Sequence, residues 1–402
     1  NAATPFPNSL LKAIHATRRI GWPRALKLTE SMALAGGLTL QVRTLSGWVR
    51  LATPVVLSES QQSWFQLKDE ERLIRVELQL QQDLFESASD SSFGAAEPVL
   101  HSDDSAEMVT LYCTDVPKMW LSSVQLRQPA EFEVLAFEDE NQPSELLCGL
   151  AFRPQWLLPL DMPLGELERL LTPVLPQHYL ELGRLGWDLA NLETIAAHNQ
   201  QALSSEEATG FYSLLRIMDT KQSKSTAMTG PNSIPPVERS PDQPPLVLSQ
   251  SRQGIGTEIT WPVRIVSATA VEVDQAEHRQ QLGAESYVQL DGFVDIGTDR
   301  IRFQPAGADQ AAAALEFEGE FPVTIVTRVE SQLTSERRSA ANQQGWSVGK
   351  YAIVTGRFYR LWSYQSELVK SSGPAARQIA PLVIASSIVP TTPPVRDKAT
   401  EV

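Results

Sequence analysis

Four short stretches of alternating apolar and polar residues occur twice in this chain, in the same order in its two halves. The first and third pairs have the same spacing along the sequence, and the spacing of the other two differs. Loops change length more readily than strands, so a duplicated β domain is expected to show such differences in the spacing between matched stretches. We therefore predict an internal duplication. The matched pairs are 49–57 with 263–271, 75–78 with 287–290, 109–112 with 323–326, and 146–148 with 382–384.

The alternation has a period of two residues, which is typical of half-buried β-strands. Five strands can be drawn in each copy, and residues 331–344, between the third and fourth strands of the second copy, are compatible with a helix. This order indicates an OB-type barrel, in which a glycine such as Gly356 often marks the bend of a strand. We predict two OB-like β-barrels, with a six-stranded barrel or a small sandwich as the alternative. The strands of the second copy are expected to begin near Pro262, Ser286, Phe321, Gly349 and Gln378.

Between the two copies the apolar residues change to helical spacing. Residues 204–207 read as a capping box that opens a helix with an apolar inner face from Phe211 to Met218. A stretch rich in Ser, Pro, Gln and Lys follows, which predicts a flexible linker. The fold class is therefore mainly β with a helical insert (α+β). The predicted parts are a basic N-terminal segment at 1–45, the first barrel at 46–158, a helical module at 159–220, a disordered linker at 221–255, the second barrel at 256–390 and a disordered tail at 391–402.

The charge of the chain argues against a general polyanion-binding protein. The formal net charge is −14, and phosphate neutralisation by Lys and Arg supplies most non-specific nucleic-acid affinity. No run of 18 apolar residues occurs, so we expect no transmembrane helix. Cys113 and Cys148 lie in strand-like stretches, where either a disulfide or buried free thiols would fit. The chain begins at Asn1, which leaves open whether a leader or anchor precedes it.

Catalytic and metal-binding motifs are absent from the sequence. GxSxG, HExxH and a P-loop do not occur, and the five histidines are scattered through different predicted parts. The neighbouring carboxylates at 103–104 and 138–140 lie in loop-like sequence, where acidic residues are usually solvated. We therefore expect no metal, no cofactor and no enzymatic activity, with a hydrolytic enzyme as the alternative.

Basic and aromatic residues alternate in the fourth strand of the second barrel. OB barrels bind single strands or sugars on such faces, where bases stack on aromatic rings and arginines contact phosphates. The alternative is that the rings belong to the core and the arginines pair with acids, because residues 256–390 hold more acidic than basic side chains. The candidate binding residues are Lys350, Tyr351, Arg357, Tyr359, Arg360 and Trp362.

Four stretches of the chain carry a resemblance to known proteins. The residues at 117–120, the pair of stretches at 185–188 and 210–215, and the stretch at 356–364 resemble uncharacterised proteins of planctomycete bacteria. The resemblance implies a cell-envelope location, with the cytoplasm as the alternative, and it implies no activity. We expect a non-catalytic structural or assembly protein with a protein partner or self-association. The alternative is a ligand-binding OB-type module for an oligosaccharide, a peptide or single-stranded nucleic acid.

Overall fold

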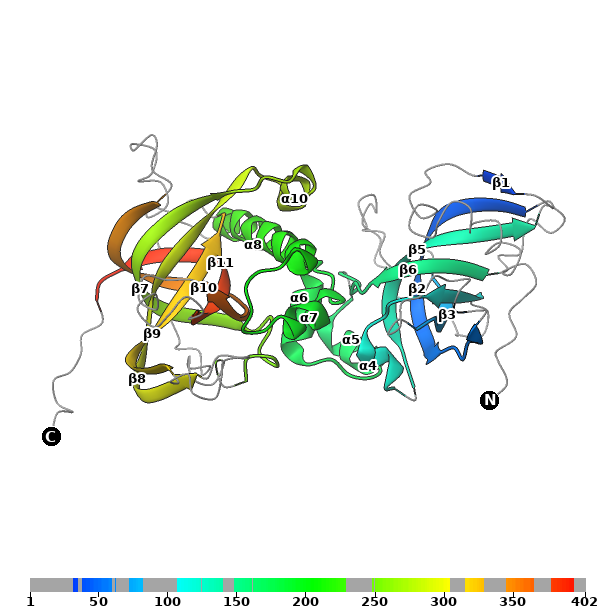
Figure 1. Ribbon diagram of the computed structural model, residues 1–402, viewed down its shortest axis with the longest axis horizontal. Coiled ribbons are helices and arrows are strands. Elements are labelled where there is room, and N and C mark those ends of the chain that lie inside the picture. Colours follow the sequence, from blue (N-terminus) through cyan, green and yellow to red (C-terminus); the bar gives the residue numbers. More distant parts are fainter. Residues whose placement is uncertain are drawn as a thin grey trace. The chain divides into compact units, whose positions relative to one another are not determined.

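The computed structural model divides the chain into two compact units, Asn1–Ala190 and Asn191–Val402 (Figure 1). The structure describes residues 32–34, 38–59, 62, 72–81, 107–123, 125–139, 148–160, 162–228, 248, 250–303, 315–328, 345–364 and 377–393.

Six strands form the sheet of the first unit, in the order β1-β2-β3-β4-β6-β5, and β2 also pairs with β5. Strands β2, β3, β4, β6 and β5 are therefore paired in a ring, in which only β4 and β6 are parallel. The strands are β1 Met32–Leu34, β2 Leu38–Pro54, β3 Ile74–Leu80, β4 Met108–Cys113, β5 Gln128–Asp139 and β6 Cys148–Gln155. The helices of this unit are α4 Lys118–Leu121, α5 Leu164–Leu170 and α6 Gln177–Arg184.

Tryptophans join the sheet of the first unit to its helical end. The buried Trp120 ring lies edge-on to Trp156, with ring centroids 5.7 Å apart. The Asp188 carboxylate accepts hydrogen bonds from the backbone N–H groups of Trp156 (2.8 Å) and Ala190 (2.9 Å). A Cβ on Gly183 of α6 would lie 2.6 Å from the Leu158 side chain, so a glycine is needed where α6 packs against this segment.

Five strands of the second unit close into a barrel in the order β10-β11-β9-β8-β7, and only β9 and β11 are parallel. The strands are β7 Glu258–Glu272, β8 Ser286–Phe303, β9 Leu315–Thr327, β10 Gly345–Tyr364 and β11 Gln378–Thr391. The helices are α7 Asn191–Ala197, the 3₁₀ helix η2 Ser205–Glu207, α8 Ala208–Met228 and α10 Ala276–Leu282.

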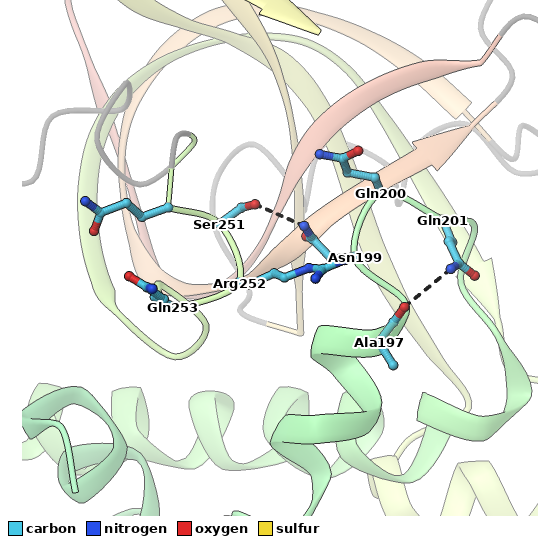
Figure 2. Close-up of a pocket in the computed structure, with 8 residues that line it drawn as sticks. Ala197, Asn199, Gln200, Gln201, Ser251, Arg252 and Gln253 are labelled. Carbon is cyan, nitrogen blue, oxygen red and sulfur yellow. Dashed lines mark hydrogen bonds between the residues drawn. The ribbon is translucent and has the colours of Figure 1, made fainter. Parts of the chain in front are cut away.

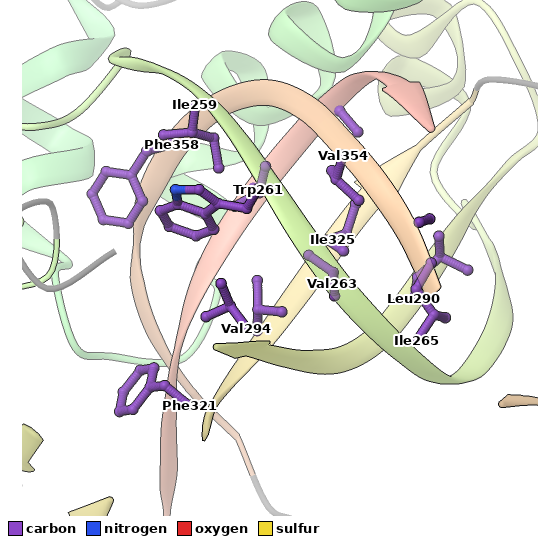
Figure 3. Close-up of a cluster of buried hydrophobic side chains, with 14 of the residues drawn as sticks. Ile259, Trp261, Val263, Ile265, Leu290, Val294, Phe321, Ile325, Val354 and Phe358 are labelled. Atoms are coloured by element: carbon purple, nitrogen blue, oxygen red, sulfur yellow. The ribbon is translucent and has the colours of Figure 1, made fainter. Parts of the chain in front are cut away.

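Alternate residues of the barrel strands fill its interior, as the period of two predicts (Figure 3). Trp261 and Val263 of β7, Val294 of β8 and Phe321 of β9 all lie within this core. At Gly356, where the sequence predicts a bend, the pairing of β10 with β11 is irregular, since its register shifts between Thr355 and Gly356. A Cβ at this glycine would clash with the backbone carbonyl of Ile384, so only glycine allows the strands to approach so closely here.

Helix α8 packs against the outside of this barrel, beside β11, β9 and α10 (Figure 1). Its predicted apolar inner face is confirmed, because Phe211, Leu214, Leu215 and Met218 are all buried. At the start of the helix the Glu207 carboxylate accepts a hydrogen bond of 2.9 Å from the Ser204 backbone N–H, as a capping box requires.

The strands of the two units pair in the same residue register. In each unit the first long strand has an irregularity, between Val49 and Leu51 in β2 and between Ile265 and Ser267 in β7. Directly after this irregularity, Leu51 pairs with Glu77 and Ser267 pairs with Asp291. Five further pairs of the first unit each correspond to a pair of the second unit. With the pair of the first unit given first, they are Val76–Leu111 with Leu290–Ile325, Leu111–Gly149 with Ile325–Val383, Gly47–Ala130 with Val263–Ala352, Phe132–Pro154 with Val354–Ile388, and Val134–Ala151 with Gly356–Ala385.

This register differs from the match that the sequence pattern predicted. The strand pairs place Val76 with Leu290, whereas the sequence match placed it with Val288. A slip of two residues keeps every side chain on the same face of a strand, so alternation alone does not detect it.

The boundary between the units falls inside the region expected to form a separate helical module, 159–220. Helices α5 and α6 belong to the first unit, whereas α7, η2 and α8 belong to the second. The expected linker at 221–255 also differs, because α8 continues to Met228 and Leu248, Ser251 and Ile255 are buried. Leu248 and Ile255 are apolar side chains buried in the second unit, and the Ser251 hydroxyl accepts a hydrogen bond from the Asn199 amide.

Several expected segments lie wholly or mostly outside the described residues. These are the helix at 331–344, most of the basic segment at 1–45, and the tail at 391–402 beyond residue 393. Cys113 is a buried free thiol, and the side chain of Cys148 is outside the described part. Within the part of the chain that is described, no helix has the length and apolar character needed to cross a membrane.

Candidate functional site

Three of the expected binding residues on β10 are inside the protein. The side chains of Arg357, Tyr359 and Arg360 are buried, with 2%, 0% and 0% of their surface exposed. The register of β10 against β11 shifts a second time, between Phe358 and Arg360. Such irregularities break the alternation of faces, so consecutive side chains are buried here.

Arg360 forms a buried ion pair with Glu207, the last residue of η2. Its Nε donates to one carboxylate oxygen of Glu207 at 2.8 Å, and Nη2 donates to the other. The guanidinium also donates to the backbone carbonyls of Gln201 (2.9 Å), Leu361 (2.8 Å) and Ala202 (3.1 Å). These hydrogen bonds occupy the N–H groups of the guanidinium, so Arg360 is not available to a ligand. Arg360 instead holds the segment 201–207 against the barrel.

Tyr359 and Arg357 have structural contacts of the same kind. The Tyr359 ring lies edge-on to Phe211 of α8, with centroids 5.6 Å apart. Burial, with a further contribution from the Glu207 charge, raises the pKa of the Tyr359 phenol well above its ordinary value. Arg357 pairs with Glu258 at 2.6 Å and donates to the Gly256 carbonyl at 3.1 Å. These residues therefore fit the alternative to a binding face, in which the aromatic rings belong to the core and the arginines pair with acids.

The other three candidates keep part of their surface exposed. Lys350 is exposed, and Tyr351 and Trp362 are half-buried. Trp362 stacks on Tyr364, with ring centroids 4.8 Å apart and an interplanar angle of 21°.

A polar group on the outer side of β8 and β9 includes an acid in an unusual environment. Asp291 accepts hydrogen bonds from Gln289 (3.1 Å) and from the Thr324 hydroxyl (3.0 Å). Burial raises the pKa of the Asp291 carboxyl, although these hydrogen bonds act in the opposite direction. The charge of Asp291 in turn contributes to the raised pKa of Tyr364, after burial.

A pocket of about 440 Å³ opens beside the end of β10 (Figure 2). Its volume lies within the roughly 300–1,000 Å³ of small-molecule sites. One wall consists of Ala197, Asn199, Gln200 and Gln201, which follow α7. The opposite wall consists of residues 250–253, which lead into β7. Both walls belong to the second unit.

Backbone hydrogen bonds align the first wall with β10. The N–H of Gln200 donates to the Leu361 carbonyl at 2.8 Å, and the N–H of Ser363 donates to the Gln201 carbonyl at 2.9 Å. Gln200 has a φ of +68°, the only positive φ of a non-glycine residue in the described part of the chain. This left-handed residue lies in the turn that follows α7, three residues after its last residue Ala197.

Asn199 ties the two walls together. Its side-chain oxygen accepts a hydrogen bond of 3.0 Å from the Leu361 N–H, and its amide nitrogen donates to the Ser251 hydroxyl at 3.0 Å. Both Asn199 and Ser251 are buried. The pocket is therefore preformed, since its walls are pinned to each other and to the barrel by buried hydrogen bonds.

Of the other polar side chains of the pocket, the Gln201 amide donates to the Ala197 carbonyl at 3.3 Å. The side chains of Gln200, Gln250, Arg252 and Gln253 have no hydrogen bond or ion pair with any described residue. Each amide presents donors and an acceptor, and Arg252 presents a guanidinium. In Figure 2 the Arg252 side chain extends from its own wall toward Asn199 and Ala197.

Sequence reasoning missed this pocket. Residues 250–253 fell in the expected linker, and the two walls are about 50 positions apart in the sequence. The available signal was the clustering of amide residues at 199–201 and 250–253, which has no recognisable spacing until the fold brings the two segments together.

Among the residues that the structure describes, no group of three or more His, Cys, Asp or Glu side chains is arranged to hold a metal ion. No protein-family model matches the chain, and a search of curated proteins finds no significant match.

Proposed function

We propose that this chain is a non-catalytic binding protein built from two OB-like barrels, which arose by duplication of one ancestral barrel. Five paired strands with a parallel third and fifth strand follow the OB plan. The shared register supports the duplication. Residue pairs between the strands β2, β3, β4, β6 and β5 of the first unit correspond to residue pairs between the strands of the second barrel, and the irregularities of the pairing lie at matching positions. Independent origins would have no reason to share bulge positions.

The binding role is assigned to the pocket between residues 197–201 and 250–253. One observation carries it: buried hydrogen bonds of Asn199 fix both walls, while the side chains of Gln200, Gln250, Arg252 and Gln253 have no hydrogen bond or ion pair with any described residue. A preformed concave site with convergent polar groups is the usual form of a small-molecule site. The Lys350, Tyr351 and Trp362 surface is a second candidate, favoured by the stacked Trp362 and Tyr364 rings.

The cell-envelope location remains part of the proposal through the resemblance to planctomycete proteins. In that setting a binding site of this kind would attach the chain to another envelope component. The assembly role and the binding role then describe the same activity.

The binding role is tested by screening the full chain against a library of small polar compounds, with NMR shifts of the Ala197 and Gln200 amides as the readout. Ser251→Ala removes the hydroxyl that Asn199 pairs with, and should weaken every compound that shifts these amides. Thr209→Ala is the matched control, because it removes one exposed hydroxyl that pairs with Gln281 in the same unit. A library with no compound that shifts these amides, or equal effects of the two variants, would contradict the proposal.

A further inference from the structure

We propose that the pocket binds a sugar acid, that is, a polyhydroxylated ring with a carboxylate, and that Arg252 binds the carboxylate. This inference rests on the proposed binding role and names the ligand class of the same site.

The charge of the pocket favours one anionic group. Arg252 is exposed and forms no ion pair with any described residue, although the chain as a whole has a net charge of −14. None of the lining residues is an acid. A planar guanidinium binds a carboxylate through two parallel hydrogen bonds, which is a stronger and more specific contact than a point charge makes.

The neutral part of the lining favours hydroxyl groups on the rest of the ligand. Gln200, Gln250 and Gln253 each carry an amide that both donates and accepts, and a sugar hydroxyl does the same. Ala197 is the only lining residue without a polar side chain. A ligand that fills this pocket must therefore offer hydrogen-bonding groups to these amides over most of the ligand's surface, because an amide that the ligand buries without a hydrogen-bond partner costs free energy.

Other ligand classes fit the lining less well. A nucleotide would need an aromatic platform for its base and more positive charge for its phosphates, and the lining residues have no aromatic ring and one cation. A divalent cation would need carboxylates. An apolar ligand would leave the amides unpaired.

The backbone at Gln200 is a second observation that points to a ligand. Its φ of +68° is a conformation that side chains disfavour, and glycine would occupy this position without strain. A glutamine here keeps an amide at the pocket. In Figure 2 this amide lies on the wall opposite residues 250–253.

The test measures the affinity of the full chain for D-glucuronate and for D-glucose, its neutral counterpart, by calorimetric titration. We expect glucuronate to bind more tightly than glucose. Arg252→Gln should lower the affinity for glucuronate by about tenfold or more and leave the affinity for glucose unchanged. Arg279→Gln is the matched control, since it removes an exposed arginine of the same unit on α10.

Two results would overturn the ligand class and leave the binding role in place. These are equal affinities for glucuronate and glucose, and equal effects of Arg252→Gln and Arg279→Gln on glucuronate. Acetate, a carboxylate without hydroxyls, is the third probe: binding as tight as that of glucuronate would show a simple anion site and would also overturn the sugar acid. If no compound of the polar library shifts the pocket amides, the binding role itself fails and this inference fails with it.

Discussion

Replacement of Glu207 by glutamine tests the account of the buried ion pair on β10. The side chains of Arg360 and Glu207 are 0% and 1% exposed, so neither charge has access to water. The glutamine would keep the size of the side chain and an oxygen for the Ser204 N–H. It would remove the negative charge and place an amide N–H group, which is a donor, where the Arg360 Nε now donates to the carboxylate. The Arg360 guanidinium would then remain buried with neutral partners. Loss of one partner from a buried pair costs about 3–5 kcal/mol, and we expect a loss of that size for Glu207→Gln.

The second unit contains a matched control with the same two residue types. Arg264 and Glu320 form an ion pair whose side chains are 36% and 33% exposed. Pairs with this access to solvent contribute about 0–1 kcal/mol, so Glu320→Gln should cost no more than that. The comparison isolates burial, because the chemical change is identical in the two variants.

A double variant separates the cost of the unpaired buried charge from the other destabilising effects of the substitutions. Glu207→Gln combined with Arg360→Met removes both charges, and the double variant should lose about 0.5–3 kcal/mol less than the two single variants added together. Native-state hydrogen exchange of β10 peptides in the full chain is the assay, because it reports the unfolding free energy of the second unit separately from the first. Equal losses for Glu207→Gln and Glu320→Gln would refute the reasoning.

Three further predictions concern single residues. Burial raises the pKa of the Asp291 carboxyl, so the folded unit holds this proton more tightly and its unfolding free energy falls as the pH rises above about 4. Asp291→Asn should flatten that fall in urea titrations between about pH 4 and 7, and parallel profiles would contradict this. Gln200→Gly should raise the unfolding free energy by up to about 1 kcal/mol in the same titrations, because it relieves a left-handed residue; a clear loss would contradict the assignment of strain. Burial, and then the Asp115 charge, raises the pKa of the Cys113 thiol, so iodoacetamide should label it at neutral pH only after unfolding, as read by peptide mass spectrometry. Rapid labelling of the native protein would disprove that placement.

The strands and their order were largely predictable, because they depend on local alternation. Val263 and Ile265 share a face in the sequence pattern and both lie in the barrel core. Gly356 also indicated a special position on its strand, since only glycine allows β10 to approach β11 there. The exact correspondence between the strand pairs of the two units was not predictable, because a shift of two residues leaves the same alternation.

The environment of the basic and aromatic residues was not predictable from the strand alone. Arg360 and Tyr359 have the composition of a binding face, but residues 201–211 cover them in the folded unit. These contacts join positions about 150 residues apart, and nothing in the sequence near β10 indicates them. The pocket was missed for the same reason, since Asn199 and Ser251 meet only through the tertiary fold.

The most direct measurement of the central claim is a crystal structure of the full chain grown with D-glucuronate at a concentration above the measured Kd. The account predicts one bound molecule between residues 197–201 and 250–253, with its carboxylate at the Arg252 guanidinium and its hydroxyls at the glutamine amides. A molecule bound against Trp362 and Tyr364, or a pocket without ligand in crystals of a protein that binds glucuronate in solution, would contradict it.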